Sequence, residues 1–215
     1  VIAPTGKNDE KIELLREQNI PFVFLDRNVQ SIEADFVTSN NREGAYRATK
    51  HLIENGHTRI GAILGPECIT TSKKRFQGYK RALEEYEISI DQDLLVRGNY
   101  RLEGGQKAGK ELLELKRPPT ALFSTNIMSN LGALKAVKNI GLSCPEDISL
   151  VGIDDTPWVD ILQPPLTVVR QKPYEMGSRA GELLFERLSD NANDQYRTRK
   201  LETELIRRES VRDIN

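Results

Sequence analysis

The chain has 215 residues, with 31 basic and 32 acidic side chains and a formal net charge of −1 at pH 7. Surfaces that bind nucleic acid by charge alone are strongly basic, so this balance argues against such a surface within these residues. No apolar run approaches the roughly 18 residues of a membrane span. Two cysteines outside any CxxC pattern do not make a disulfide scaffold, which favours a cytoplasmic protein.

Short apolar runs alternate with helical patterns along the whole chain. The predicted strands are 20–25 (IPFVFL), 36–38 (FVT), 59–64 (RIGAIL), 94–97 (LLVR), 120–124 (TALFS), 148–153 (ISLVGI), 166–170 (LTVVR) and 201–207 (LETELIR). Helical spacing of apolar residues predicts helices near 9–18, 41–55, 71–86, 105–115, 126–139 and 173–188. Strands alternating with such helices are typical of βαβ units, so the predicted fold class is α/β with doubly wound parallel sheets.

Residues 147–188 are the most informative stretch. The run Ile148–Ile153 is short and rich in β-branched residues, which is typical of a strand buried on both faces, and it ends at Asp154 and Asp155. The pair Pro164-Pro165 then forces an extended crossing. A buried strand that ends in acids and leads at once into another sheet is typical of the hinge side of a two-lobed binding protein.

The helical intervals also predict which side chains face the core. The inward residues are Ile12, Leu14 and Leu15 in the first helix, Phe76, Tyr79, Leu83 and Tyr86 in the third, Leu131, Leu134 and Val137 in the fifth, and Met176, Ala180, Leu183, Leu184 and Leu188 in the last. The residues 189–195 read as a polar turn without regular structure.

Polar or aromatic side chains stand just past six of the predicted strands. They are Asp26, Thr71, Arg75, Tyr100, Asn126, Asp154 and Gln171. Because the carboxyl ends of parallel strands meet at one crevice, we expect these residues to form a binding site. Carboxylates, amides and Arg can bind vicinal hydroxyls, and a Tyr ring can cover the apolar face of a sugar or base. The set suits recognition of a polyol or nucleobase and is poor for catalysis.

Each of these residues alone has a plainer interpretation. An Asp or Asn after a strand is more often a helix cap or a turn residue. Asn126 could simply cap its helix, Asp155 is expected to form a cap or turn, and Arg75 could be a surface residue. Trp158 is left open between a wall of the pocket and packing between the lobes.

Signals for catalysis or metal binding are weak. Gly104–Lys110 (GGQKAGK) matches part of a phosphate loop, but Glu111 stands where Ser or Thr would bind magnesium, so a helix N-terminus is expected. His51 and His57 are six residues apart, off the spacing of a helical metal pair, and surface or helix-end positions are expected. We predict no enzymatic activity, no cofactor and no metal site.

Seven stretches of the chain resemble the lactose-repressor/galactose-repressor (LacI/GalR) family. They are 36–41 (FVTSNN), 44–61 (GAYRATKHLIENGHTRIG), 75–83 (RFQGYKRAL), 119–126 (PTALFSTN), 132–141 (GALKAVKNIG), 145–157 (PEDISLVGIDDTP) and 164–177 (PPLTVVRQKPYEMG). They stand in family order and at family spacing over essentially the whole chain.

The resemblance implies a fold of the periplasmic-binding-protein type, with two α/β lobes joined by three crossings and the effector between them. Lobe one would hold residues 1–37 and 171–198, and lobe two residues 38–170 and 199–212. The protein would be a cytoplasmic homodimer that regulates transcription, with a helix-turn-helix domain that reads operator DNA. That domain and the opening strand–helix–strand of lobe one are expected to be absent from this chain, since Val1–Gly6 reads as a half-strand and a turn.

The resemblance also places the family's effector positions on the seven residues named above. Two positions depart from the family pattern. Ile127 stands where Asp usually follows the Asn, and Ile69 stands about where purine-binding members carry a second Arg upstream of Arg75, which this chain lacks. A sugar or sugar derivative is therefore the expected effector. A periplasmic sugar-binding protein of a transporter shares the fold and is the alternative, and a signal peptide and a monomeric state would identify it.

Overall fold

A computed structural model describes residues 1–5, 9–189 and 195–215, so most of the turn predicted at 189–195 lies outside the described residues. The chain forms two compact units, each with its own core. Unit 1 contains residues 1–40, 68–71 and 171–203, and unit 2 contains residues 41–67, 72–170 and 204–215. No described helix is both long and apolar enough to cross a bilayer.

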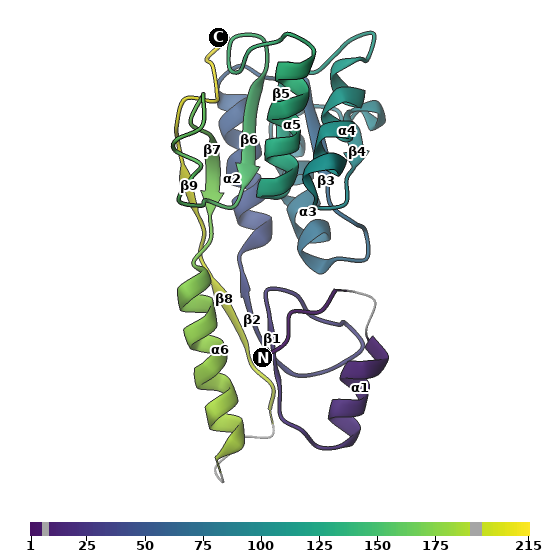
Figure 1. Cartoon of the computed structure of the whole chain (residues 1–215), viewed down its shortest axis with the longest axis vertical. Helices are drawn as coiled ribbons and strands as arrows, with labels where there is room; N and C mark the ends of the chain where they lie inside the picture. The colour runs from purple at the N-terminus through teal and green to yellow at the C-terminus, as the bar shows by residue number, and fades with distance from the viewer. Residues whose placement is uncertain (6–8, 190–194) are drawn as a thin grey trace. The chain divides into compact units, whose positions relative to one another are not determined.

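Unit 1 is built on a parallel three-stranded sheet (Figure 1). Its strands, in spatial order, are β1 (Val23–Leu25), β2 (Asp35–Ser39) and β8 (Thr198–Leu201), and its helices are α1 (Asp9–Glu17) and α6 (Pro173–Leu188). Successive strand residues point to opposite faces, so Val23 packs with Met176 of α6 while Phe24 packs with Ile12 of α1. The sheet is thereby covered on both faces.

Unit 2 is built on a six-stranded sheet. Its spatial order is β4 (Leu95–Arg97), β3 (Ile60–Leu64), β5 (Ala121–Ser124), β6 (Ser149–Ile153), β7 (Thr167–Arg170) and β9 (Glu204–Ile206). All neighbouring pairs are parallel except β7 and β9, which are antiparallel. The predicted parallel α/β fold is therefore confirmed, with one antiparallel edge that the sequence analysis did not predict.

Helices cover both faces of this second sheet. They are α2 (Asn41–Glu54), α3 (Thr70–Glu85), α4 (Leu102–Leu113) and α5 (Ile127–Asn139), with a short 3-10 helix η1 (Gln92–Leu94) before β4. In β6 the side chains of Val151 and Ile153 join the core under α2 and α3, and that of Leu150 joins the core under α4 and α5. Burial on both faces explains why this strand is mostly apolar, with even its one polar side chain, Ser149, fully buried.

Several predicted details are wrong. The strand predicted at 201–207 is two strands, β8 and β9, one in each unit. On α1, Leu14 is 54% exposed, and on α5 Leu131 is only partly buried, whereas the neighbouring Asn130 is fully buried. Adjacent helix residues differ by about 100° in direction, so a small error in helix orientation exchanges which of them faces the sheet. Among the other side chains predicted to be inward, those of Leu15, Phe76 and Leu184 are only partly buried, and those of Tyr86 and Leu188 are exposed.

Candidate functional site

Four of the seven predicted site residues lie in unit 2. Tyr100, Asn126 and Asp154 come just past its strands, and Arg75 lies on α3. Ser124 of β5 is level with Gly152 of β6. Two residues further on, Asn126 and Asp154 therefore leave neighbouring strands at the same height. The structure brings these two residues to one edge of the sheet, and hydrogen bonds attach the other two to that edge.

Arg75 is attached to this edge from α3. Its side chain is 4% exposed, so the alternative of a surface residue is wrong. Nε donates to Oδ1 of Asn41 at 2.7 Å, and Nη1 donates to the carbonyl oxygen of Thr125 at 2.6 Å. These two bonds fix the plane of the guanidinium. A fixed guanidinium can present its other N–H groups to a hydroxyl or carboxylate without further ordering.

Asn126 holds two neighbouring segments in place. Its Oδ1 accepts from the backbone N of Ser129 at 3.1 Å, so the interpretation as a cap of α5 is confirmed. Its Nδ2 donates to the carbonyl oxygen of Tyr100 at 3.2 Å. An amide has two N–H donors and two acceptor lone pairs, so Asn126 keeps one N–H and one lone pair after these two bonds.

The ring of Tyr100 crosses the end of β3 above Gly65. A Cβ atom at Gly65 would lie 2.1 Å from Cζ of the ring, closer than any two such atoms approach. The Tyr100 ring can therefore lie here only because residue 65 has no side chain. An aromatic face beside amides and carboxylates suits the apolar face of a sugar or base.

Three of the predicted site residues have left-handed backbone. The five described non-glycine residues with positive φ are Asn19, Asp26, Glu87, Tyr100 and Asp154. Asn19 and Glu87 follow α1 and α3, where Ile20 donates to Leu15 and Ile88 to Leu83 as in ordinary helix ends. The other three values are 62° for Asp26, 62° for Tyr100 and 80° for Asp154. Such backbone costs about 1–3 kcal/mol per residue and clusters at functional sites.

Asp155 has a different role from the predicted cap or turn. Its carboxylate accepts from Nη2 of Arg170 at 2.7 Å and from Nη2 of Arg208 at 2.9 Å. The Asp155 side chain is 7% exposed. It joins the end of β6 to β7 and to the segment after β9. The sequence analysis missed this because Arg208 lies 53 residues away.

The other three predicted site residues belong to unit 1 and are Asp26, Thr71 and Gln171. The backbone N of Asp26 donates to Val37 at 2.8 Å, and its carbonyl oxygen accepts from Oγ1 of Thr38 at 3.1 Å. Both bonds fix Asp26 beside β2. Gln171 follows β7 directly, and Thr71 is buried in the first turn of α3.

The remaining sequence motifs are structural. Gly104–Lys110 lies within α4, so the helix interpretation is confirmed. Of the expected surface or helix-end positions, His57 takes the helix end: its backbone N donates to Leu52 just past α2, and its side chain is buried. Burial lowers the pKa of both His51 and His57, and burial raises the pKa of the Cys144 thiol to about 12. Among the described residues, no three His, Cys, Asp or Glu side chains are grouped closely enough to hold a metal ion.

Comparisons with known proteins agree with this architecture. The model of the periplasmic binding protein-like domain matches residues 49–211. The HTH-type transcriptional repressor PurR of Vibrio atlanticus (strain LGP32) is 35% identical over 208 residues, which are 96% of this chain and 62% of that protein. The chain thus spans less than two thirds of the length of this relative.

Two solved structures carry bound sugars. The transcriptional regulator CelR–cellobiose complex is 32% identical, with a TM-score of 0.89 over 94% of this chain and 62% of that one. A LacI family transcriptional regulator from Enterococcus faecium, with bound ribose, is 26% identical, with a TM-score of 0.87 over 99% of this chain and 78% of that one. Both of these structural similarities extend over the two units of this chain.

Proposed function

We propose that this chain, which belongs to the periplasmic binding protein-like domain family as an effector-binding core of the LacI/GalR type, senses a small sugar-like ligand on behalf of a transcription regulator. The observation that carries the proposal is the edge of unit 2 where Asn126 and Asp154 leave the sheet beside Arg75 and Tyr100. The bound cellobiose and ribose of the two similar structures support a sugar as the ligand class.

The chemistry of this edge suits binding. The carboxylate of Asp154 accepts from sugar hydroxyls, the guanidinium of Arg75 donates to them, and the ring of Tyr100 covers an apolar sugar face. Strained backbone at Tyr100 and Asp154 holds both groups ready before the ligand arrives. The proposed role is recognition without a chemical step, in keeping with the relatives, which are named as regulators.

Regulation is proposed to act through the two lobes. Asp26 and Gln171 of lobe one (1–37 and 171–198) would complete the site formed by lobe two (38–170 and 199–212), which within these bounds includes Thr71. A ligand that binds one lobe arrangement better shifts the equilibrium towards it, typically with about 1–3 kcal/mol of coupling. In a cytoplasmic homodimer this shift would reach operator DNA through a helix-turn-helix domain outside this chain. The named relatives are regulators, which disfavours the alternative of a periplasmic transport protein.

A thermal-shift screen of the intact protein tests the proposal. The panel contains monosaccharides, disaccharides, sugar phosphates, sugar acids and purines. A ligand at about 100 times its Kd adds about 2.7 kcal/mol of stability, and we expect a sugar or sugar derivative to do so. A response to purines alone, or to nothing in the panel, would contradict the proposed ligand class.

Substitutions at Asp154 then test the site itself. Asp154→Ala should abolish the ligand response in a folded protein. Asp154→Gly should also abolish it and should raise stability by about 1 kcal/mol, because glycine adopts a φ of 80° without the steric penalty of a side chain. The control is Asp160→Ala, at an exposed acid on the following loop, which should change neither property. Normal ligand affinity in folded Asp154→Ala would sink the assignment.

A further inference from the structure

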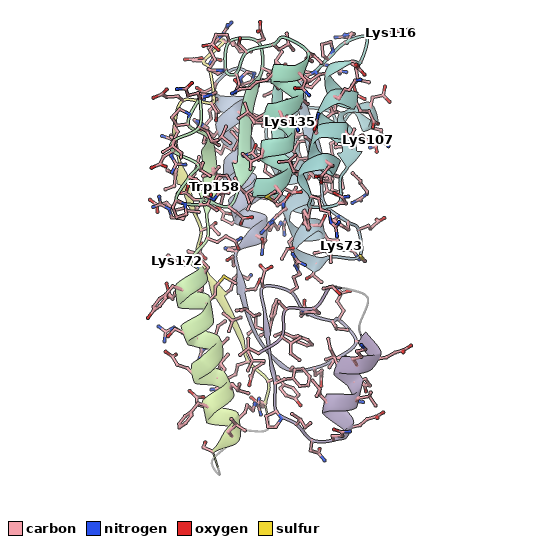
Figure 2. The ribbon with its side chains drawn as sticks, viewed as in Figure 1. Lys73, Lys107, Lys116, Lys135, Trp158 and Lys172 are labelled. Carbon is pink, nitrogen blue, oxygen red and sulfur yellow. The ribbon has the colours of Figure 1, made fainter. Side chains whose placement is uncertain are left out.

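Trp158 is an aromatic residue at the same end of unit 2 that the proposed site does not yet use. It is the single tryptophan of the sequence, it lies on the loop between β6 and β7, and it is 37% exposed. Figure 2 shows it where β6 and β7 end. Tryptophan is highly buried on average, so this exposure at the ligand-binding edge needs an explanation.

The loop around Trp158 is anchored on both sides. Before it, the carboxylate of Asp155 is bound by Arg170 and Arg208. After it, Val159 is fully buried and its backbone N donates to the carbonyl oxygen of Thr156 at 3.0 Å. The exposed ring is therefore carried by a fixed turn. An aromatic on a rigid support loses little conformational entropy when a ligand covers it.

The sheet order places Trp158 well away from Tyr100. The Tyr100 ring lies at the end of β3, and the strands that follow in space are β5, β6 and β7. Neighbouring strands are about 4.8 Å apart, so two or three spacings separate the two aromatic residues by about 10–14 Å. Asn126 and Asp154, at the ends of β5 and β6, stand between them. Across this edge the order is aromatic, polar, aromatic.

We propose that the ligand is a saccharide of at least two rings, with one ring on Tyr100 and another on Trp158. This inference rests on the proposed sugar-sensing function. The C–H face of a pyranose packs on an aromatic ring, and the hydroxyls at its rim bond to the amide and carboxylate between the two aromatic residues. A single ring spans fewer strands and contacts one aromatic residue at a time.

The test compares disaccharides with their own monosaccharides on the intact protein. Cellobiose, maltose and lactose are titrated beside glucose and galactose, by calorimetry and by the fluorescence of Trp158, isolated as the difference from Trp158→Phe. We expect a disaccharide to bind more tightly than its constituent sugars and to change this fluorescence. Trp158→Ala should lower the affinity for that disaccharide about tenfold or more and leave the affinity for the monosaccharides unchanged. Trp158→Phe, which keeps an aromatic face, should restore part of the loss.

Tyr86→Ala is the matched control. Tyr86 is 38% exposed, also in unit 2, but it follows the far end of α3, so its loss should affect neither sugar class. The inference is overturned if Trp158→Ala weakens both sugar classes equally, or neither. It is also overturned if Trp158→Ala alters the oligomeric state on a sizing column with affinity unchanged, which would make Trp158 a contact between copies. Binding of monosaccharides alone overturns this inference and leaves the proposed function standing, whereas binding of no sugar overturns both.

Discussion

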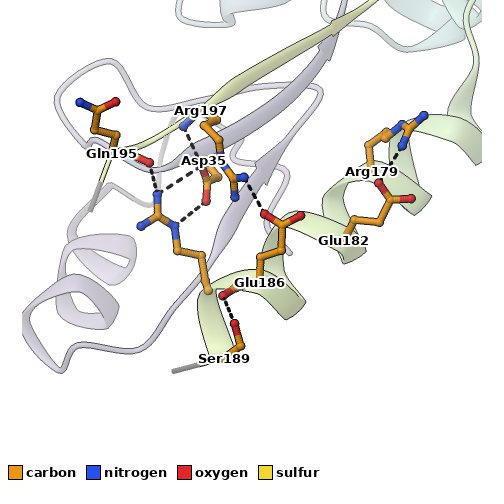
Figure 3. A network of polar contacts seen from close by, with 8 residues as sticks. Asp35, Arg179, Glu182, Glu186, Ser189, Gln195 and Arg197 are labelled. Carbon is orange, nitrogen blue, oxygen red and sulfur yellow. Dashed lines mark hydrogen bonds and ion pairs between the residues drawn. The ribbon is translucent and has the colours of Figure 1, made fainter. Parts of the chain in front are cut away.

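In each unit, one buried aspartate binds two arginines and helps to hold the last strand in place. In unit 1, Asp35 accepts from Nε of Arg187 at 2.6 Å and from the backbone N of Arg197 at 2.7 Å (Figure 3). In unit 2, Asp155 accepts from Arg170 and Arg208. In both units, one arginine comes from the segment 197–208 that also supplies β8 and β9.

The two networks differ in where they stand along the sheet. Asp35 begins β2, at the amino end of the strand, and its side chain is fully buried. Asp155 follows β6 at the carboxyl end and is the neighbour of Asp154. We expect an ion network at the amino end to serve the fold alone, whereas one at the carboxyl end would also fix the proposed ligand-binding edge. The following predictions test this difference.

The largest effect is expected from Asp35→Ala. Removing the carboxylate leaves Arg187, 13% exposed, and Arg197, 31% exposed, without their shared acceptor. Loss of one partner of a buried pair costs about 3–5 kcal/mol, measurable by denaturant unfolding, while ligand affinity of the folded fraction should not change. The control is Glu182→Ala on α6, whose exposed pair with Arg179 should be worth under about 1 kcal/mol. Equal costs for both variants would contradict the prediction.

Asp155→Ala should be less costly to stability and more costly to function. Arg170 is 47% exposed and can be solvated after the change, so we expect a loss of about 2–3 kcal/mol. Because the residue after Asp154 then loses its bonds to Arg170 and Arg208, the position of Asp154 becomes less defined and ligand affinity should fall. Unfolding and calorimetry on the same sample separate the two effects. Unchanged affinity would show that the network at this end serves the fold alone.

The smallest effect is expected from acidification. His51 and His57, the two histidines of the sequence, both lie in unit 2, and burial lowers the pKa of each. The unfolded chain takes up protons near pH 6.5 while the native histidines stay neutral. Their contribution to stability is therefore complete above that pH and is lost as the pH falls through it towards the native pKa. Unit 2 should be destabilised in this window, and unit 1 should not.

His57→Asn provides the check on this pH dependence. His57 lies between Oγ1 of Thr120, 2.9 Å from Nδ1, and the carbonyl oxygen of Arg212, 3.2 Å from Nε2. The carbonyl requires Nε2 to carry the proton in the neutral ring. The shorter Asn keeps an acceptor for Thr120 near the position of Nδ1 and does not titrate. Unfolding followed from about pH 7.5 to about pH 5.5 should show a flatter slope for the variant. The same slope in both proteins would assign the dependence to other groups.

The sequence predicts most strands and helices because burial on both faces leaves a local signal. The run Ile148–Ile153 is an example: four of its six residues are Ile, Leu or Val, and it is β6 within one residue. The ion pair of Asp155 with Arg208 has no such signal, since nothing near either residue indicates a partner 53 positions away. The inward position of Asn130 is equally hidden, because a polar residue between apolar ones does not mark a buried face.

Some features of the candidate site could likewise be predicted from the sequence, and others could not. The rule that ligands meet the carboxyl ends of strands was enough to select Asn126 and Asp154. The left-handed backbone of Asp26, Tyr100 and Asp154 could not be predicted, because the residue that most often marks such backbone is glycine. The exposure of Trp158 could not be predicted either, since it depends on where the loop is anchored.

The segment 197–208 has a consequence for biosynthesis. A ribosome makes it after every other strand described here, so until it emerges both β2 and β7 have an open edge, and Asp35 and Asp155 each lack an arginine. Open strand edges recruit other chains. A nascent chain that stalls or is cleaved before residue 197 would expose two such edges, one in each unit. A single break would therefore leave a defect in both units for cellular quality control to detect.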